Sequence, residues 1–329
     1  MAEIGIILGR ILVVFVVLLL SVAYMTWVER KIIGHMQSRL GPHRVGWHGL
    51  LQPIADGLKL IFKEDIVVAA ADKVIYHIAP AIIVATALLN AAVIPFGGNT
   101  TIFGQEVPLR IADVNIGLLY ILALSSLGVY GIVLGGWSSN NKYALMGGLR
   151  SAAQMISYEL PLGLATIGVL MHTGSLSLVK IVESQAQQVW FFIPQFVGFL
   201  IFFICGVAEC NRTPFDLPEA ESELVAGFHV EYSSMKFGFF MLAEYASVII
   251  MSALTVTLFF GGWLGPAFLP GYVWFGLKVF FFCFVFVWLR ATFPRFRYDQ
   301  LMKFGWKVLF PLSLLNIAGT AVVMLLGMD

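Results

Sequence analysis

Three acidic residues lie within or at the ends of long apolar stretches, where acids are rare. They are Glu159, Glu209 and Glu244. A charged side chain near the middle of a bilayer costs about 2.5–3.5 kcal/mol even on lenient insertion scales, so ionisable residues there usually mark a functional path. Carboxylates that share a weakly screening environment titrate as a coupled set. The pattern predicts a proton relay, and Tyr130, on a neighbouring apolar stretch, is included as a further proton-carrying group.

A structural role is the alternative for each acid, as the partner of a buried arginine or of a donor on a neighbouring helix. At 1.5 Å per residue, Glu159 should lie about 13 Å, and Glu244 about 12 Å, from the start of its helix. Glu209 should lie on the same membrane side, close to the end of its helix, and Tyr130 about two turns in from the end of its own helix. This shared depth on four consecutive helices favours a relay. Pro161 is expected to kink the helix beside Glu159.

A run of acids lies between the fifth and sixth apolar stretches and interrupts an otherwise basic side of the chain. The run consists of Asp216, Glu219, Glu221 and Glu223. Glutamates that follow Pro218 at a first helical position would be favoured by the helix dipole. The helix dipole explains the glutamates at the start of a helix, but it does not explain why Asp216 is acidic as well.

The loop after the first apolar stretch contains an amphipathic segment that begins at Pro53. Its apolar residues share one helical face, and its charged residues lie opposite. The two sets are Ile54, Leu58, Ile61 and Phe62, and Asp56, Lys59 and Lys63. Such a helix is expected to lie in the plane of the membrane interface, either as a simple anchor or as part of a site. The last polar loop alternates cations with aromatic residues around Arg295, a pattern that a solvated basic flank would also show.

The composition identifies the elements that must position these groups. Apolar residues make up 59% of the chain and charged residues 12%, whereas soluble domains carry about 25% charged residues. The apolar runs match a hydrocarbon layer roughly 30 Å thick. We therefore expect an all-α, polytopic membrane protein, with residues 1–329 in a single membrane domain. The expected spans are 3–27, 74–95, 115–137, 150–172, 190–210, 236–261, 272–291 and 307–327.

The basic residues are distributed unequally between the two sides. Most of the 20 Lys and Arg residues lie by the loops after the first, third, fifth and seventh spans. The other side and its flanks keep Arg10, Arg110, Lys180 and Lys278. The positive-inside rule places the richer loops in the cytoplasm and both termini outside. Basic residues spread in this way do not indicate a nucleic-acid site.

The cysteines predict neither a metal site nor a redox cluster on this chain. Cys205, Cys210 and Cys283 lie in apolar stretches and include no C-x-x-C pair. Any redox cofactor of an associated reaction is expected on a partner chain. The amino-terminal stretch is expected to be a retained span and not a cleaved signal, since no small-residue cleavage site follows it.

Several polar segments together resemble those of the subunit called H in bacterial respiratory complex I, equivalent to mitochondrial NADH dehydrogenase subunit 1. They cover nearly the whole chain in order. The segments are VERK at 28–31, RLGP at 39–42, ADGLK at 55–59, GWSSN at 136–140, SYE at 157–159, NRTPFD at 211–216 continuing to 224, and RFRYDQ at 295–300.

This resemblance implies a proton-pumping NADH–quinone oxidoreductase with quinone as its substrate. Flavin and iron–sulfur clusters would be on partner subunits. The chain would form part of the quinone chamber, with the quinone tail entering between the first span, the amphipathic helix and the sixth span. Residues assigned to the chamber and its coupling loop are Arg30, Lys31, Arg39, Asp56, Lys59, Arg212, Asp216, Glu219, Glu221, Glu223 and Arg295. Glu159, Glu209, Glu244 and Tyr130 would begin the proton relay.

The resemblance also implies partners and a location. The partners would be the peripheral-arm subunits at the quinone site, small membrane subunits, and lipid. The location would be the bacterial inner membrane, or the inner mitochondrial membrane for an organellar protein. Two alternatives remain at this point: the related core membrane subunit of a hydrogenase or formate-hydrogenlyase complex, and an independent transporter that uses the carboxylates as its own relay.

Overall fold

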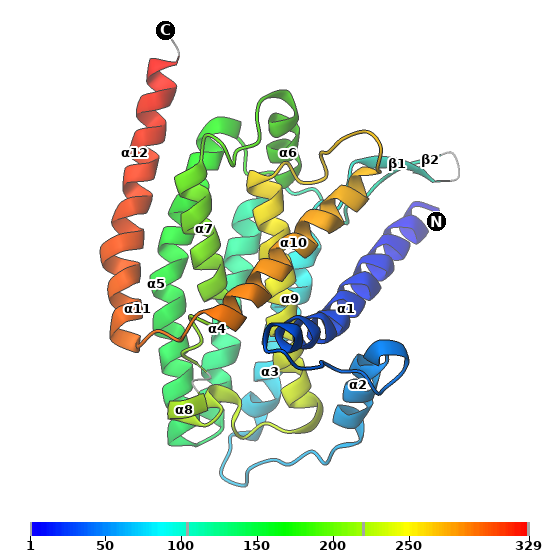
Figure 1. The fold of residues 1–329 in the computed structure, drawn as a ribbon, viewed down its shortest axis with the longest axis vertical. Helices are drawn as coiled ribbons and strands as arrows, with labels where there is room; N and C mark the ends of the chain where they lie inside the picture. Colours follow the sequence, from blue (N-terminus) through cyan, green and yellow to red (C-terminus); the bar gives the residue numbers. More distant parts are fainter. Residues whose placement is uncertain (1, 103–104, 219–220, 328–329) are drawn as a thin grey trace.

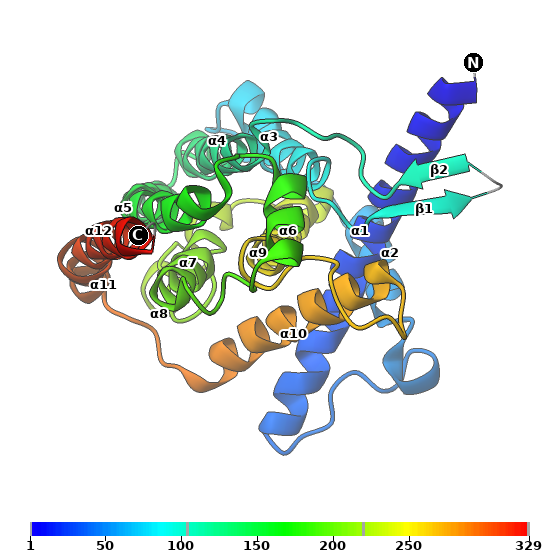
Figure 2. The same ribbon diagram turned by 90° about the horizontal axis from the view of Figure 1, so that it is seen from above.

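The computed structural model describes residues 2–102, 105–218 and 221–327. Long helices stand side by side, with α1 and α10 crossing the others obliquely (Figures 1 and 2). The helices are α1 Ala2–Met36, α2 Gln52–Phe62, α3 Lys73–Ala91, α4 Gly117–Ser138, α5 Lys142–Thr173, α6 Leu178–Gln187, α7 Phe196–Glu209, α8 Glu221–Leu224, α9 Ser234–Phe259, α10 Gly271–Thr292, α11 Tyr298–Phe304 and α12 Phe310–Leu326. A π-helical turn, Gly305–Leu309, joins α11 to α12, and short 3₁₀ turns lie at Trp47–Gly49 and Gly227–His229.

The predicted all-α membrane fold is confirmed. Seven helical segments of the described chain are long and apolar enough to cross a membrane: α1, α3, α4, α5, α9, α10 and the continuous segment Tyr298–Leu326. Helix α7 is a shorter apolar helix. Each of the eight expected spans coincides with one of these helices. In the described chain, β-structure consists of the hairpin β1 Asn99–Ile102 and β2 Gln105–Pro108, with Asn99 opposite Pro108.

The fifth span is shorter than predicted. We expected 190–210, but residues 191–195 form turns and α7 has 14 residues, or about 21 Å at 1.5 Å per residue. Pro194 gives the physical reason, because proline disfavours helical backbone in the residue before it. The side chain of Gln195 then bonds Thr320 of α12 at 2.7 Å, which fixes the turn against the last helix.

Local sequence sets the ends of the helices that carry the acids. Asn141 begins α5, its side chain accepting a hydrogen bond of 2.9 Å from the Tyr143 amide. Gly174 ends α5 in the left-handed conformation at φ +64°. The helix continues through Pro161. On α4, a Cβ at Gly136 would collide with the carbonyl of Ala144, so glycine allows α4 and α5 to approach closely.

The amphipathic helix is also present. Pro53 lies in the first turn of α2, and Ile54, Leu58 and Ile61 are all exposed along it. Helix α2 packs against α1 and α9, and Ser234 at the start of α9 donates to the carbonyl of Leu60 at 3.0 Å. Helices α2 and α8 lie at one end of the bundle, and α6 and the hairpin at the other (Figure 1). The basic loops and the acidic run therefore share one end.

Candidate functional site

A buried arginine organises the charged groups at the basic end of the bundle. Arg212 follows α7, and its Nε lies 2.7 Å from a carboxylate oxygen of Glu244 on α9. One Nη lies 3.5 Å from Glu29 on α1, and the guanidinium group lies over the Tyr245 ring at 4.3 Å. Burial opposes the charge of Arg212, but Glu244 and Glu29 outweigh burial and raise its pKa. The arginine is thus held as a cation between two carboxylates.

Glu29 has a second cationic partner, Arg290 at the end of α10. Glu29 is buried, whereas the Arg290 side chain is 36% exposed. The network therefore runs Arg290–Glu29–Arg212–Glu244 and ties α10, α1 and α9 to the loop after α7. Its four formal charges cancel, which is how proteins accommodate buried ions. The predicted site included Arg212 and Glu244 but omitted both Glu29 and Arg290.

Asp216 forms a second ion pair beside this network. Arg295 contacts it at 2.9 Å, and Asp216 is buried while Arg295 is about one-third exposed. Burial raises the pKa of Asp216 to about 6, and Arg295 opposes the rise. Gln154 on α5 holds the backbone on both sides of the loop, donating to Ala208 at 2.8 Å and to Phe215 at 2.7 Å. The Gln154 side chain of α5 therefore holds the loop between α7 and α8 in place.

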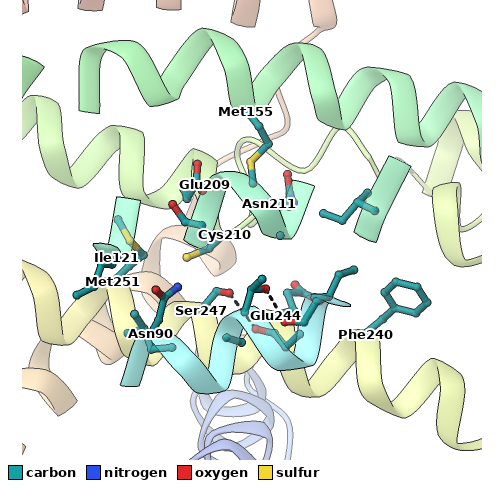
Figure 3. A pocket seen from close by; sticks show the side chains of 18 of the residues that line it. Asn90, Ile121, Met155, Glu209, Cys210, Asn211, Phe240, Glu244, Ser247 and Met251 are labelled. Atoms are coloured by element: carbon teal, nitrogen blue, oxygen red, sulfur yellow. Dashed lines mark hydrogen bonds between the residues drawn. The ribbon is translucent and has the colours of Figure 1, made fainter. Parts of the chain in front are cut away.

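A cavity of about 80 Å³ lies between α3, α4, α7 and α9, and its largely apolar wall carries a few polar side chains (Figure 3). Glu209 and Glu244 both line it. Glu209 is 8% exposed, forms no ion pair with any described residue, and has one carboxylate oxygen without a hydrogen-bond partner among them. A cavity of this size has room for several water molecules, and the polar groups of its wall can hold them. The cavity can therefore hold a hydrated path between the two acids.

Glu159 lies beside the cavity. It accepts a hydrogen bond from Ser126 on α4, and the preceding residue, Ser125, lines the cavity. The structure thus brings the three predicted acids to one region of the bundle, on α5, α7 and α9.

Tyr130 does not join this group. Its side chain is 62% exposed on α4, and it is not among the residues that line the cavity. The role of Tyr130 in the relay stays a prediction, because its side chain lies on the outer surface of this chain, apart from the three acids.

The predicted residues of the first loop form a separate, exposed group. Arg30 on α1 pairs with Asp56 on α2 at 2.6 Å, and Gln52 donates to the other Asp56 oxygen at 2.9 Å. Lys31 lies over the Trp27 ring at 5.8 Å. Arg39 donates to Gln37 at 2.7 Å. Lys59 is exposed on α2.

The other acids of the predicted run differ from Asp216. Glu223 is 55% exposed and pairs with Arg150 at 2.5 Å. Glu221 begins α8, and its side chain lies outside what the structure describes, as does the whole of Glu219. Over the described ranges, no group of three or more His, Cys, Asp or Glu residues could hold a metal ion.

Known proteins resemble this chain over almost its whole length. A family model described as NADH dehydrogenase matches residues 9–321. A Geobacter sulfurreducens protein, named as the first of two H subunits of NADH-quinone oxidoreductase, is 61% identical over 96% of this chain and 94% of its own.

Two further relatives come from other bacterial groups. The H subunit of Thermomicrobium roseum is 55% identical over 94% of both chains. A second H subunit of Rhizobium meliloti is 52% identical over 97% of both chains. The chain therefore belongs to the NADH dehydrogenase family, among membrane proteins named as the H subunit of NADH-quinone oxidoreductase.

Proposed function

We propose that this chain is the membrane subunit of a proton-pumping NADH–quinone oxidoreductase that forms part of the quinone chamber and begins the proton relay. It acts as a subunit of an enzyme complex, like the relatives named above. One observation carries the finer proposal: charged groups continue from the loop at Asp216, through Arg212 and Glu244, to the cavity that Glu209 lines.

Asp216 and Arg295 supply the part of this arrangement that senses quinone. Reducing a quinone to a quinol takes up two electrons and two protons, so the charge of the chamber changes during turnover. At 4 Å and an effective dielectric constant near 20, one unit charge acts on another with about 4 kcal/mol. Moving one charge against 100 mV costs about 2.3 kcal/mol. A change of one charge at that distance from a titrating group is therefore large enough to drive a proton step.

Arg212 supplies the link from the loop to the membrane interior. It lies between Glu29 and Glu244, so a shift of the guanidinium group towards either carboxylate weakens its hold on the other. Glu244 also lines the cavity with Glu209. A change in charge near Asp216 can thus reach Glu209, and then Glu159 beside it, without any redox group in the membrane.

The apolar faces of α1 and α2 support entry of the quinone tail from lipid. Leu12 and Val13 on α1, and Leu58 and Ile61 on α2, are all exposed. Helices α1, α2 and α9 pack against one another at the basic end. The polar groups of this region, which include the Arg30–Asp56 pair, would then contact the quinone head. The basic end would face the cytoplasm and dock the peripheral subunits that carry flavin and iron–sulfur clusters.

Glu209→Gln in the assembled complex tests the relay, because it removes the exchangeable proton and keeps the volume. NADH-driven proton pumping should be lost, while electron transfer from NADH to a hydrophilic acceptor continues in the peripheral arm. Glu183→Gln on α6 makes the same chemical change at an exposed acid outside the network and should pump normally. Wild-type pumping by Glu209→Gln would refute the relay at this residue.

Isolation of the native complex, with identification of its chains, tests the assignment to an NADH-dependent enzyme against a hydrogenase.

A further inference from the structure

An uncharged polar side chain lies in the same cavity as the two acids. Asn90 on α3 is 6% exposed, and its Oδ1 accepts no hydrogen bond from any described residue. Its amide points into the cavity, towards the side chains of Cys210 and Ser247 (Figure 3). A buried amide oxygen without a partner is costly, and native proteins satisfy such groups with ordered water when the site is polar and roomy.

The hydroxyl groups of the cavity wall are already engaged within their own helices. Ser125 donates to the carbonyl of Leu122 at 3.0 Å, and Ser247 donates to that of Ala243 at 2.9 Å. Their oxygens can accept from water, but their protons are directed to these carbonyls or, for Ser125, to the Glu209 carboxylate. Two amides line the described wall, Asn90 and Asn211. The Asn211 oxygen accepts from Gln154 at 3.3 Å, whereas the Asn90 oxygen has no described donor, so the Asn90 amide can both donate to the cavity and accept from it.

We propose that Asn90 is a positioning residue that orients the water between Glu209 and Glu244. This inference rests on the proposed relay. The two acids line the cavity from α7 and α9, and Asn90 lines it from α3. A buried water molecule needs two to four polar partners. Asn90 supplies one partner that cannot titrate, so it holds the water without taking the proton.

The transfer balances at every atom. The protonated carboxyl group of one acid gives its proton to the water oxygen, and the water gives one of its own protons to the other carboxylate. One O–H bond breaks and one forms at the water, which is restored. Throughout the transfer, the Oδ1 of Asn90 accepts a hydrogen bond from the water proton that is not transferred, and the amide remains unchanged. Replacing it by an apolar side chain leaves the water with fewer partners and interrupts the transfer.

The test uses the assembled complex in proteoliposomes, with Asn90→Leu as the main variant. We expect roughly tenfold slower coupled quinone reduction, as for loss of a hydrogen bond in a charged path. The H₂O/D₂O rate ratio should also increase, while NADH oxidation by a hydrophilic acceptor stays unchanged. Asn316→Leu is the matched control, because it makes the same change in another membrane helix. The Asn316 amide lies outside the cavity and donates to Gln195 at 3.0 Å. It should leave the isotope ratio unchanged.

Asn90→Ala and Asn90→Ser keep the test decisive if leucine prevents assembly, since the two differ by one hydroxyl group. Serine should restore most of the coupled rate that alanine loses. The proposal is overturned if Asn90→Leu and Asn90→Ala pump at the wild-type rate per assembled complex while Glu209→Gln does not. If Glu209→Gln also pumps at that rate, the relay itself is wrong and the role of Asn90 falls with it.

Discussion

Glu29 provides a sharp test of the charge network, because sequence patterns did not place it in the site. Its carboxylate is buried and contacts both Arg212, at 3.5 Å, and Arg290. Glu29→Gln keeps the shape of the side chain but leaves two arginines with Glu244 as their remaining acidic partner in the network. At 3.5 Å and an effective dielectric constant near 20, the lost attraction to Arg212 is about 5 kcal/mol. Breaking a buried pair by removing one partner costs a similar amount, about 3–5 kcal/mol.

That loss should appear in function as well as in stability. Without Glu29, Arg212 is held by Glu244 alone, so Glu244 is bound more firmly and responds less to charge in the quinone chamber. We expect quinone reduction to fall by at least tenfold in assembled complex. NADH oxidation by a hydrophilic acceptor should continue, since it does not involve this chain.

A double-mutant cycle separates the network from a simple packing defect. Arg290→Met removes the more exposed cation, and the pair Glu29→Gln with Arg290→Met restores charge balance. The double variant should therefore recover part of the assembly and activity lost by Glu29→Gln. Additive losses in the double variant, or wild-type quinone kinetics in Glu29→Gln, would refute the reasoning.

Three further predictions follow from the described contacts. Asp216, with its pKa raised by burial to about 6, should give quinone reduction an acidic limb near pH 6, since protonation breaks the pair with Arg295. Asp216→Asn should lower the rate and remove that limb, and a limb that persists contradicts the assignment. Glu223→Gln should change the rate less than twofold in the same assay, because exposed ion pairs contribute about 0–1 kcal/mol. Cysteine at Lys63 should react with impermeant thiol reagents from the cytoplasmic side and cysteine at Gln187 from the other; the opposite labelling would reverse the orientation.

The sequence predicts the helices well, because long apolar runs with few charges have one stable arrangement in a bilayer. It predicts less well which face of each helix is buried. Helix α4 is apolar all round, so its pattern could not show that the Tyr130 side chain is exposed. The acidic run has the same difficulty, since Asp216 is buried and Glu223 is exposed although the two lie seven residues apart.

Glu29 shows why partners far apart in the chain are hard to identify from sequence. It lies directly before Arg30 and Lys31, so it looks like part of a charged membrane flank. Its burial depends on Arg290, which is 261 residues away, and on Arg212 from another loop. The sequence does show an acid at the end of an apolar run, and arginines at the ends of other runs. This pattern indicates that the acid pairs with an arginine, but it does not identify which arginine is the partner.

The two acids of the cavity should respond differently to the same substitution. Glu244 pairs with buried Arg212 at 2.7 Å, whereas Glu209 forms no ion pair with any described residue. Glu244→Gln leaves a buried cation without its nearest partner, so we expect poor assembly of the complex on native gels. Glu209→Gln leaves no such cation, so the complex should assemble normally but fail to pump. Normal assembly with lost pumping in both variants would show that Glu244 is needed to carry protons and not to keep Arg212 in place. Poor assembly in both would show that Glu209 has a buried cationic partner in the complete complex.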